Sequence, residues 1–156
     1  MKLLLLTFGF GALSAIIPIF NMEAYVVVVY AKAPHSSLAS SAFVLAAVGS
    51  LGQNVGKMIW FYAARGALNF PWLQKRLEDP KRKASYEKWR AQVEGRPVFS
   101  GVLTFISAAI GIPPFFVMAA VAGSLRMNVF VFFVAGLFGR VLFFWAILAG
   151  LGLFLR

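Results

Sequence analysis

The fold is decided by two stretches in which proline interrupts an apolar segment: Ile16-Ile-Pro-Ile-Phe-Asn-Met-Glu-Ala24 and Ile112-Pro-Pro-Phe-Phe-Val-Met-Ala-Ala120. They share five identities in nine aligned positions. Proline inside a helix removes a backbone hydrogen bond, and its ring clashes with the preceding turn. We therefore expect the chain to reverse direction at the helix breakers, which are Pro18, Pro113 and Pro114.

The composition is that of an integral membrane protein. Of the 156 residues, 61% are hydrophobic and 13% are charged, whereas soluble domains average about 25% charged residues. The chain has no cysteine and one histidine, so disulfides and thiol chemistry are absent and a histidine-based metal site or catalytic triad is not expected. We predict one membrane domain over residues 1–156 that uses no metal or cofactor and is not an enzyme.

The net charge of +10 is concentrated in one segment. Residues 65–97 carry nine basic and four acidic side chains. Such a segment is typical of a cytoplasmic loop, and we place it on the cytoplasmic side of the cytoplasmic (inner) membrane. Within it we expect a helix from Ser85 to Gly95, lying either on the membrane or in water. Headgroup contacts are expected at Arg65, Lys81, Arg82 and Lys83.

Four apolar segments remain. Residues 38–64 and 128–155 are each long enough to cross a bilayer, and we predict both as transmembrane helices. Residues 3–33 and 98–125 contain the breakers, and we predict re-entrant hairpins that leave the membrane on the face by which they enter. A signal peptide beginning at Lys2 is the alternative for the first segment, but its apolar character continues to Ala31, which favours the hairpin.

A hairpin followed by a span therefore occurs twice, in residues 1–64 and 98–156. A hairpin makes no net crossing and a span makes one, so the second copy must be upside down relative to the first. Inverted repeats are typical of transporters, whose binding sites lie where interrupted helices meet near the midplane. The predicted fold class is an all-α inverted repeat of two re-entrant hairpins and two transmembrane helices, with a basic cytoplasmic loop.

Small residues indicate where the spans pack. Glycine lets two helix backbones approach closely in a membrane, and polar neighbours can hydrogen-bond across the contact. We expect such polar neighbours in Gln53, Asn54 and Lys57. The packing residues are predicted to be Gly49, Gly52, Gly56, Gly123 and Gly139.

Lone charges in the apolar segments form the candidate site. Glu23 is the only acidic residue outside residues 65–97, and Arg140 lies close to the midpoint of the second predicted span. A charge in the bilayer core costs at least about 2.5–3.5 kcal/mol, so it should face the interior and have a partner. Glu23 either titrates in a cavity or sits at the water boundary, and Arg140 either binds substrate or pairs with Glu23. Snorkelling to the surface is the alternative for Lys57. The substrate and proton site is predicted at Glu23, Arg140, Lys57, Asn54 and Asn21.

The order of these residues resembles the DedA family, also called the SNARE-associated Golgi or VTT-domain superfamily, and particularly its short YqaA-type members. The resemblance is carried by Ser14-Ala-Ile-Ile-Pro18 followed by Glu23, by Gly49-Ser-Leu-Gly52 through Gly56 to Arg65-Gly66, and by Ala122-Gly123 through Arg126 to Gly139-Arg140. It implies two re-entrant helices and two spans, and translocation of lipids such as polyprenyl phosphates or phospholipids. Glu23 matches the family's carboxylate after the first re-entrant proline. The arginine that larger members place near the second proline is absent from residues 108–116.

We therefore expect a transporter that moves an anionic lipid or a lipid-linked phosphate between leaflets. Its partners would be membrane lipids and their anionic headgroups, and not nucleic acid. Proton coupling through Glu23 and assembly into a homo-oligomer are open alternatives. The rival functions are an enzyme that modifies a lipid phosphate, an exporter of small ions or drugs, and an assembly factor that recruits a partner through Lys81, Arg82 and Lys83.

Overall fold

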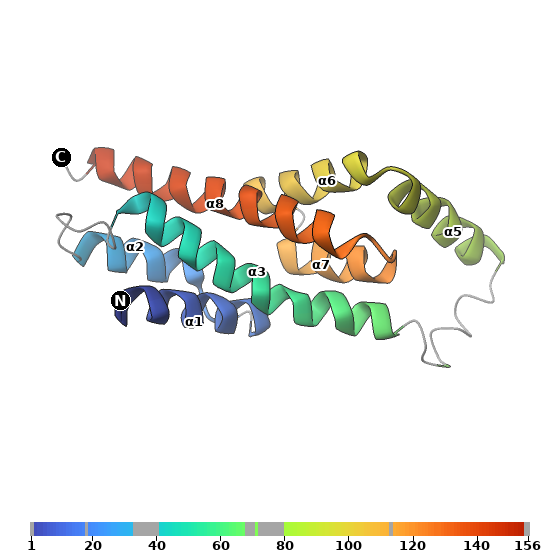
Figure 1. The fold of residues 1–156 in the computed structure, drawn as a ribbon, viewed down its shortest axis with the longest axis horizontal. Helices are drawn as coiled ribbons and strands as arrows, with labels where there is room; N and C mark the ends of the chain where they lie inside the picture. Colours follow the sequence, from blue (N-terminus) through green and yellow to red (C-terminus); the bar gives the residue numbers. More distant parts are fainter. Residues whose placement is uncertain are drawn as a thin grey trace.

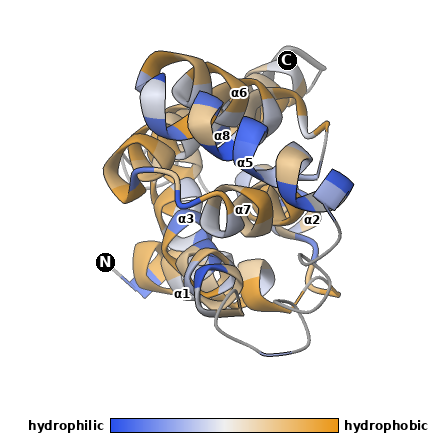
Figure 2. Cartoon of the chain, turned by 90° about the vertical axis from the view of Figure 1, so that its right-hand side faces the viewer, coloured by the Kyte–Doolittle hydropathy of each residue, from blue (hydrophilic) through white to orange (hydrophobic). Residues whose placement is uncertain are grey.

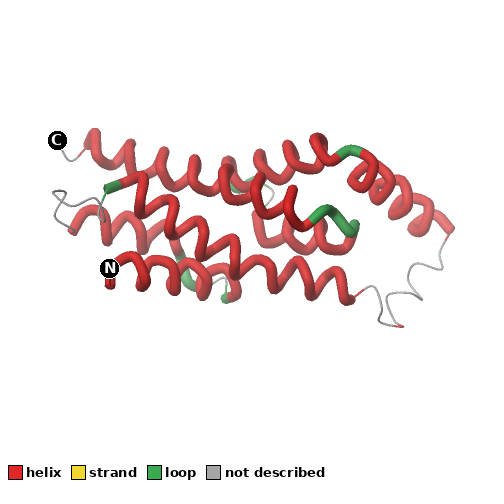
Figure 3. The backbone as a smooth tube through the Cα atoms, viewed as in Figure 1, coloured by secondary structure: helices red, strands yellow, loops and turns green. Residues whose placement is uncertain are grey.

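The computed structural model describes residues 2–17, 19–32, 41–67, 71, 80–112 and 114–154, apart from the side chains at positions 82 and 152–154. Helices make up nearly all of these residues, and none of them forms a strand (Figure 3). The prediction of an all-α membrane protein is confirmed. The breakers Pro18 and Pro113 lie outside the described residues. The helices are α1 (Lys2–Ile16), α2 (Met22–Lys32), α3 (Ala42–Ala67), α5 (Pro80–Gly95), α6 (Pro97–Ile110), α7 (Phe115–Ser124) and α8 (Val129–Phe154).

Two of the described helices, α3 and α8, are long and apolar enough to cross a membrane. They correspond to the predicted spans at residues 38–64 and 128–155, with the described part of α3 displaced toward the C-terminus. The other apolar helices have 10–15 residues, which is too short for a bilayer that needs about 20. The apolar helices in the described part of the chain are therefore two of membrane-spanning length and two pairs of short ones.

The short pairs lie beside opposite halves of the long helices (Figure 1). α1 and α2 occupy the half near the chain termini, and α6 and α7 occupy the other half. In each pair, the ends joined to each other lie near the middle of α3 and α8. α1 packs on α3 and α6 packs on α8, whereas α2 contacts α8 and α7 contacts α3. Each pair is thus anchored to both long helices.

Local hydrogen bonds and backbone conformations form the two points where the chain reverses direction. After α1, the N–H of Phe20 donates to the carbonyl of Ile17 at 3.2 Å. Asn21 then caps α2, because its Oδ1 accepts the N–H of Ala24 at 3.0 Å. α6 ends at Gly111, which has φ +82° and donates its N–H to the Ser107 carbonyl. Pro114 then directly precedes α7, so the only breaker in the described part of the chain lies at a helix boundary.

Glycine permits the close packing of the short helices on the long ones. A Cβ at Gly52 would collide with the Phe8 carbonyl oxygen of α1, and one at Gly139 would lie 2.6 Å from the Phe105 carbonyl oxygen of α6. A Cβ at Gly123 of α7 would likewise collide with the backbone of Phe61 in α3. The helices therefore approach to backbone contact, as small residues allow in membranes. Gly56 lies in the same α1–α3 contact and faces Ala12, whereas Gly49 faces the side chain of Met22 on α2.

The predicted helix of the basic loop begins five residues earlier than expected, at Pro80 and not at Ser85. Proline is tolerated in a first helical turn, and the lysines, arginine and alanine that follow are good helix formers. Tyr86 Oη donates to the Ser124 carbonyl at 2.7 Å, and Val93 is buried. α5 and α6 meet at a bend of 99°.

Hydrophilic residues are prominent on α5, whereas most of the other helices are hydrophobic (Figure 2). On its exposed side, Arg90 forms an ion pair with Glu94 at 3.0 Å. The hydrogen bond and charge of Glu94 raise the pKa of Arg90. α5 therefore resembles a water-facing helix that is attached at Tyr86 and Val93.

We predict that Gly52→Ala destabilises the protein by about 1–3 kcal/mol, because the added methyl group forces α1 away from α3. Gly9→Ala is the matched control in the same helix pair, since a Cβ at Gly9 has no atom within 4 Å. It should stabilise by up to about 1 kcal/mol through helix propensity. Reversible unfolding in mixed detergent micelles measures both. Equal effects of the two substitutions would contradict the packing described here.

Candidate functional site

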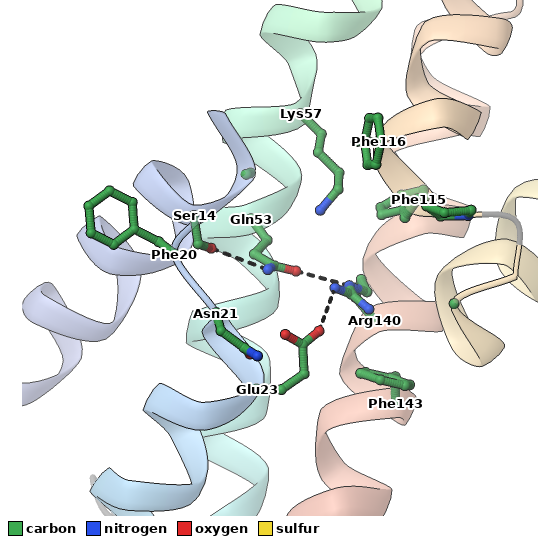
Figure 4. A pocket seen from close by; sticks show the side chains of 13 residues that line it. Ser14, Phe20, Asn21, Glu23, Gln53, Lys57, Phe115, Phe116, Arg140 and Phe143 are labelled. Atoms are coloured by element: carbon green, nitrogen blue, oxygen red, sulfur yellow. Dashed lines mark hydrogen bonds and ion pairs between the residues drawn. The ribbon is translucent and has the colours of Figure 1, made fainter. Parts of the chain in front are cut away.

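A polar cluster lies between the long helices, near their middle. Arg140 of α8 is only 7% exposed. Its Nε donates to Gln53 Oε1 of α3 at 2.9 Å, and its Nη2 contacts Glu23 Oε1 of α2 at 3.2 Å (Figure 4). A buried guanidinium requires such partners, because an unpaired charge in the bilayer core is costly. The structure thus brings together the two lone charges that the sequence identified.

A second hydrogen bond extends the cluster to α1. Gln53 Nε2 donates to Ser14 Oγ at 3.2 Å, and that hydroxyl donates to the Gly11 carbonyl at 2.8 Å. The connected side chains of Ser14, Gln53, Arg140 and Glu23 come from four different helices. Gln53 uses its amide oxygen for Arg140 and its amide nitrogen for Ser14, which fixes its orientation. The guanidinium is therefore held in a defined direction.

Two aromatic rings lie beside the guanidinium. The Cζ of Arg140 lies 4.8 Å from the ring centroid of Phe143 and 5.0 Å from that of Phe144. Arginine is attracted to aromatic faces at these distances, more strongly when water is excluded. Both rings are on α8, and Figure 4 shows Phe143 directly beside Arg140.

Lys57 is a second cation at the same place. It is 5% exposed, and its Nζ lies 4.9 Å from the ring centroid of Phe115 on α7. No carboxylate in the described part of the chain lies within ion-pair distance of this ammonium group. Figure 4 shows the side chain pointing toward the Gln53–Arg140 pair. Lys57 therefore does not snorkel to the surface. With Arg140 and Glu23, it gives the cluster a formal charge of +2 − 1 = +1.

These groups line a cavity of about 480 Å³, within the usual range of ligand sites. Both reversals of the chain contribute to it: Phe20 and Asn21 line it from the first, and Gly111 and Pro114 from the second. The Glu23 side chain is 38% exposed, so it lies on the open side. The two proline-interrupted segments thus meet at one polar cavity near the middle of the long helices.

The other predicted binding residues are placed differently. Asn21 is at the rim, but its Oδ1 is occupied in capping α2. Asn54 does not line the cavity. Its Nδ2 donates to the Phe133 carbonyl of α8 at 2.6 Å, and its Oδ1 is buried without a partner among the described residues. Asn54 therefore joins α3 to α8. None of the five glycines predicted for packing lines the cavity.

The predicted headgroup contacts lie away from the cavity. Arg65 is in the last turn of α3 and lines a separate hollow of about 650 Å³ together with Arg126 and Glu94. Lys81 and Lys83 are exposed on α5. The side chain of Arg82 lies outside the described part of the structure. These residues are near the end of the molecule formed by α5.

Ser14 is not among the site residues that the sequence predicts, and Gln53 is predicted only as a polar neighbour in helix packing. A signal for Gln53 was present. It directly follows Gly49-Ser-Leu-Gly52, as Arg140 directly follows Gly136-Leu-Phe-Gly139, and each is the twelfth residue of its helix. Aligning the spans in addition to the breakers would have paired these two positions. Ser14 carries no comparable signal, since hydroxyl groups are frequent in membrane helices.

A scan against protein-family models, a search of curated proteins and a search of solved structures each find no match to this chain. Among the described residues, no group of three or more His, Cys, Asp or Glu side chains is placed to hold a metal ion.

We predict that a double-mutant cycle of Glu23→Gln and Arg140→Gln gives a coupling energy of about 1–2 kcal/mol, because each substitution alone leaves the other charge unpaired in the cavity. Unfolding free energies in detergent supply the four values. The Arg90–Glu94 pair on α5 is the matched control, with the same residue types at 3.0 Å but exposed to water. Its coupling should be much smaller. Additive effects at Glu23 and Arg140 would show that the pair contributes nothing to folding.

Proposed function

We propose that the protein is a transporter that moves an anionic lipid or a lipid-linked phosphate between the leaflets of the cytoplasmic (inner) membrane. The observation that carries this proposal is the cavity halfway along α3 and α8, with two buried cations and one partly exposed carboxylate. Charged groups at such a depth are retained at a cost, and they mark substrate or ion pathways. The excess positive charge favours an anion.

The proposed architecture is an inverted repeat, with residues 1–64 and 98–156 as its two copies. Three correspondences support it. α1 meets α3 at Gly52 as α6 meets α8 at Gly139. Thr7 and Thr104 each donate to the carbonyl four residues earlier, and each directly precedes the phenylalanine whose carbonyl meets the glycine. Gln53 and Arg140 occupy the same helical position.

Inverted repeats allow one half to move against the other around a fixed central site. In this arrangement the first hairpin opens to one face of the membrane and the second to the opposite face. By the positive-inside rule, the basic residues 65–97 favour the cytoplasmic face for the second hairpin. The same order of elements supports membership of the DedA family, which remains part of the proposal.

In the proposed mechanism, Arg140 and Lys57 neutralise the phosphate of the headgroup through charge-assisted hydrogen bonds. Glu23 competes with the phosphate for Arg140, because its carboxylate is already 3.2 Å from Nη2. Protonation of Glu23 frees the guanidinium for the phosphate. Loss of that proton restores the Glu23–Arg140 pair and favours release of the lipid. Gln53 keeps Arg140 oriented in both states through the bond to Nε.

The proposed topology predicts the faces from which single cysteines react. The chain has no natural cysteine, so each label reports one position. Lys2→Cys and Lys32→Cys should react with a membrane-impermeant maleimide on intact cells, because both ends of the α1–α2 pair face outward. Arg96→Cys and Ser124→Cys should react only after permeabilisation. Labelling of positions 2 and 32 from opposite faces would mean that α1 and α2 cross the membrane, which excludes the inverted repeat.

Transport predicts a loss of lipid exchange when the cavity charges are removed. Arg140→Gln should slow leaflet exchange of a labelled anionic lipid in proteoliposomes by about 10- to 100-fold, since a hydrogen bond to a charged group contributes about 1.5–3 kcal/mol. Glu23→Gln should also slow it, because release loses its competitor. Arg90→Gln removes the same charge from the exposed face of α5 and should leave the rate unchanged. Wild-type rates in both Glu23→Gln and Arg140→Gln would remove the proposal.

A further inference from the structure

An apolar groove runs along the surface of α1 and α2 and reaches the polar cavity. It consists of two adjoining hollows of about 310 and 470 Å³, which share Phe10 and Tyr25. The larger hollow also shares Phe20 and Asn21 with the central cavity. The groove and the cavity are therefore neighbours across these two residues. We call this surface the α1–α2 groove; its floor includes Gly9 and Ala24.

Aromatic rings that pack against one another form the wall of the α1–α2 groove. Phe10 and Tyr25 are stacked, with ring centroids 4.3 Å apart and an interplanar angle of 14°. Phe20 meets Phe10 edge-on at 5.9 Å. Tyr25 Oη lies 3.3 Å from Thr7 Oγ1, so its polar end already has a partner within the protein. The lining thus presents ring faces and aliphatic side chains, and few polar atoms.

Phe20 lies between the polar cavity and the α1–α2 groove. It lines both the cavity and the groove, and its ring points away from the Arg140 cluster (Figure 4). The adjoining Ile19 is 88% exposed, which leaves the groove open along its side. A molecule in contact with Arg140 would pass Phe20 and Asn21 to reach the groove. Such a molecule needs one anionic end and one apolar end.

We propose that the α1–α2 groove binds the hydrocarbon chain of an amphiphile whose anionic headgroup occupies the Arg140–Lys57 cavity. This inference rests on the proposed function and specifies its substrate as a molecule held at both ends. A second copy of the chain is a poorer occupant, because an apolar helix face would cover the groove and leave the positive charge of the cavity without a counterpart. The shared residues Phe20 and Asn21 favour a single ligand that spans both.

The groove fixes the position of the bound hydrocarbon chain and supplies little hydrophobic free energy. Bilayer lipid is as apolar as the groove, so transfer of a chain between them gains little. A held chain instead keeps the headgroup beside Arg140 and Lys57, which lowers the entropic cost of binding there. Filling the groove should therefore weaken capture of the anionic lipid at the cavity. It should leave the binding of a free phosphate compound unchanged.

Photolabelling tests the inference directly. An anionic phospholipid with a photoreactive group in its acyl chain is incubated with the full-length protein in nanodiscs, and labelled peptides are mapped. We expect labelling concentrated on residues 2–32, well above that from a probe with the same chain and an uncharged headgroup. Ala24→Leu and Gly9→Leu should reduce this labelling to the level of the uncharged probe. Both positions tolerate the change, because Ala24 is exposed and a Cβ at Gly9 meets nothing within 4 Å.

Gly150→Leu is the matched control. A Cβ at Gly150 on α8 also meets no atom within 4 Å, and this position does not line the groove. Its labelling should equal that of the wild type. Excess glycerol phosphate should displace the anionic probe from the wild type by competing at the cavity alone, and it should bind Ala24→Leu equally well.

The outcomes separate this inference from the proposed function. Labelling of residues 2–32 that is the same for both probes, or unaffected by Ala24→Leu, would overturn the groove even if lipid exchange occurs. A change of oligomeric state in Ala24→Leu, seen by cross-linking, would assign the groove to a second copy and also overturn it. Headgroup-dependent labelling without any lipid exchange would uphold the groove as a lipid site and reject transport.

Discussion

The burial of Arg140 near the midpoint of a long apolar helix is the constraint on which the rest of the structure depends. A guanidinium cannot lose its proton to escape the cost of burial, so the protein must supply acceptors at that depth. It does so from two other helices, with Gln53 on α3 and Glu23 on α2, and the rings of Phe143 and Phe144 lie beside the charge. Each acceptor needs its own helix to approach α8 closely.

Close approach in turn explains the glycines and the short helices. α2 can bring Glu23 to mid-depth because the chain reverses between Ile16 and Met22 instead of continuing across. α1 then packs against α3 at Gly52, which lets Ser14 reach the neighbouring Gln53. On the other side, α6 packs at Gly139, directly beside Arg140. Gly52 precedes Gln53, and Gly139 precedes Arg140. The glycines let the helices approach closely, and this close approach allows the neighbouring polar side chains to hydrogen-bond.

Sequence alone predicts much of this fold. Proline breakers and segment lengths identify the two long helices and the two short pairs, because both signals are local. Lone charges also identify Glu23 and Arg140, since few other charges lie in the apolar segments. The sequence does not distinguish Gln53 from Asn54, which are neighbours on α3. The orientation of α3 about its own axis, relative to α8, determines that Gln53 faces the cavity and that Asn54 faces the Phe133 carbonyl.

Two further features depend on more than the apolar pattern of their segment. Apolar periodicity predicts a helix from Ser85, and this start is wrong, because the helix begins at Pro80 through backbone propensity. For Lys57 the sequence leaves snorkelling to the surface open, because its distance from the helix end permits it. Tertiary packing excludes it, since the side chain lies between α3 and the Phe115 ring of α7. The surroundings of a side chain in the folded protein depend on other segments and therefore cannot be read from its own segment.

The proposed mechanism depends on competition between Glu23 and an anionic headgroup for Arg140. Equilibrium binding of an anionic lipid to the purified protein in nanodiscs tests this competition through the signs of two effects. We expect Arg140→Gln to weaken binding, because the cation is lost, and Glu23→Gln to tighten binding, because the internal competitor is lost. Weaker binding in both variants would show that Glu23 supports the anion site instead of competing for it, and the proposed competition would then be wrong.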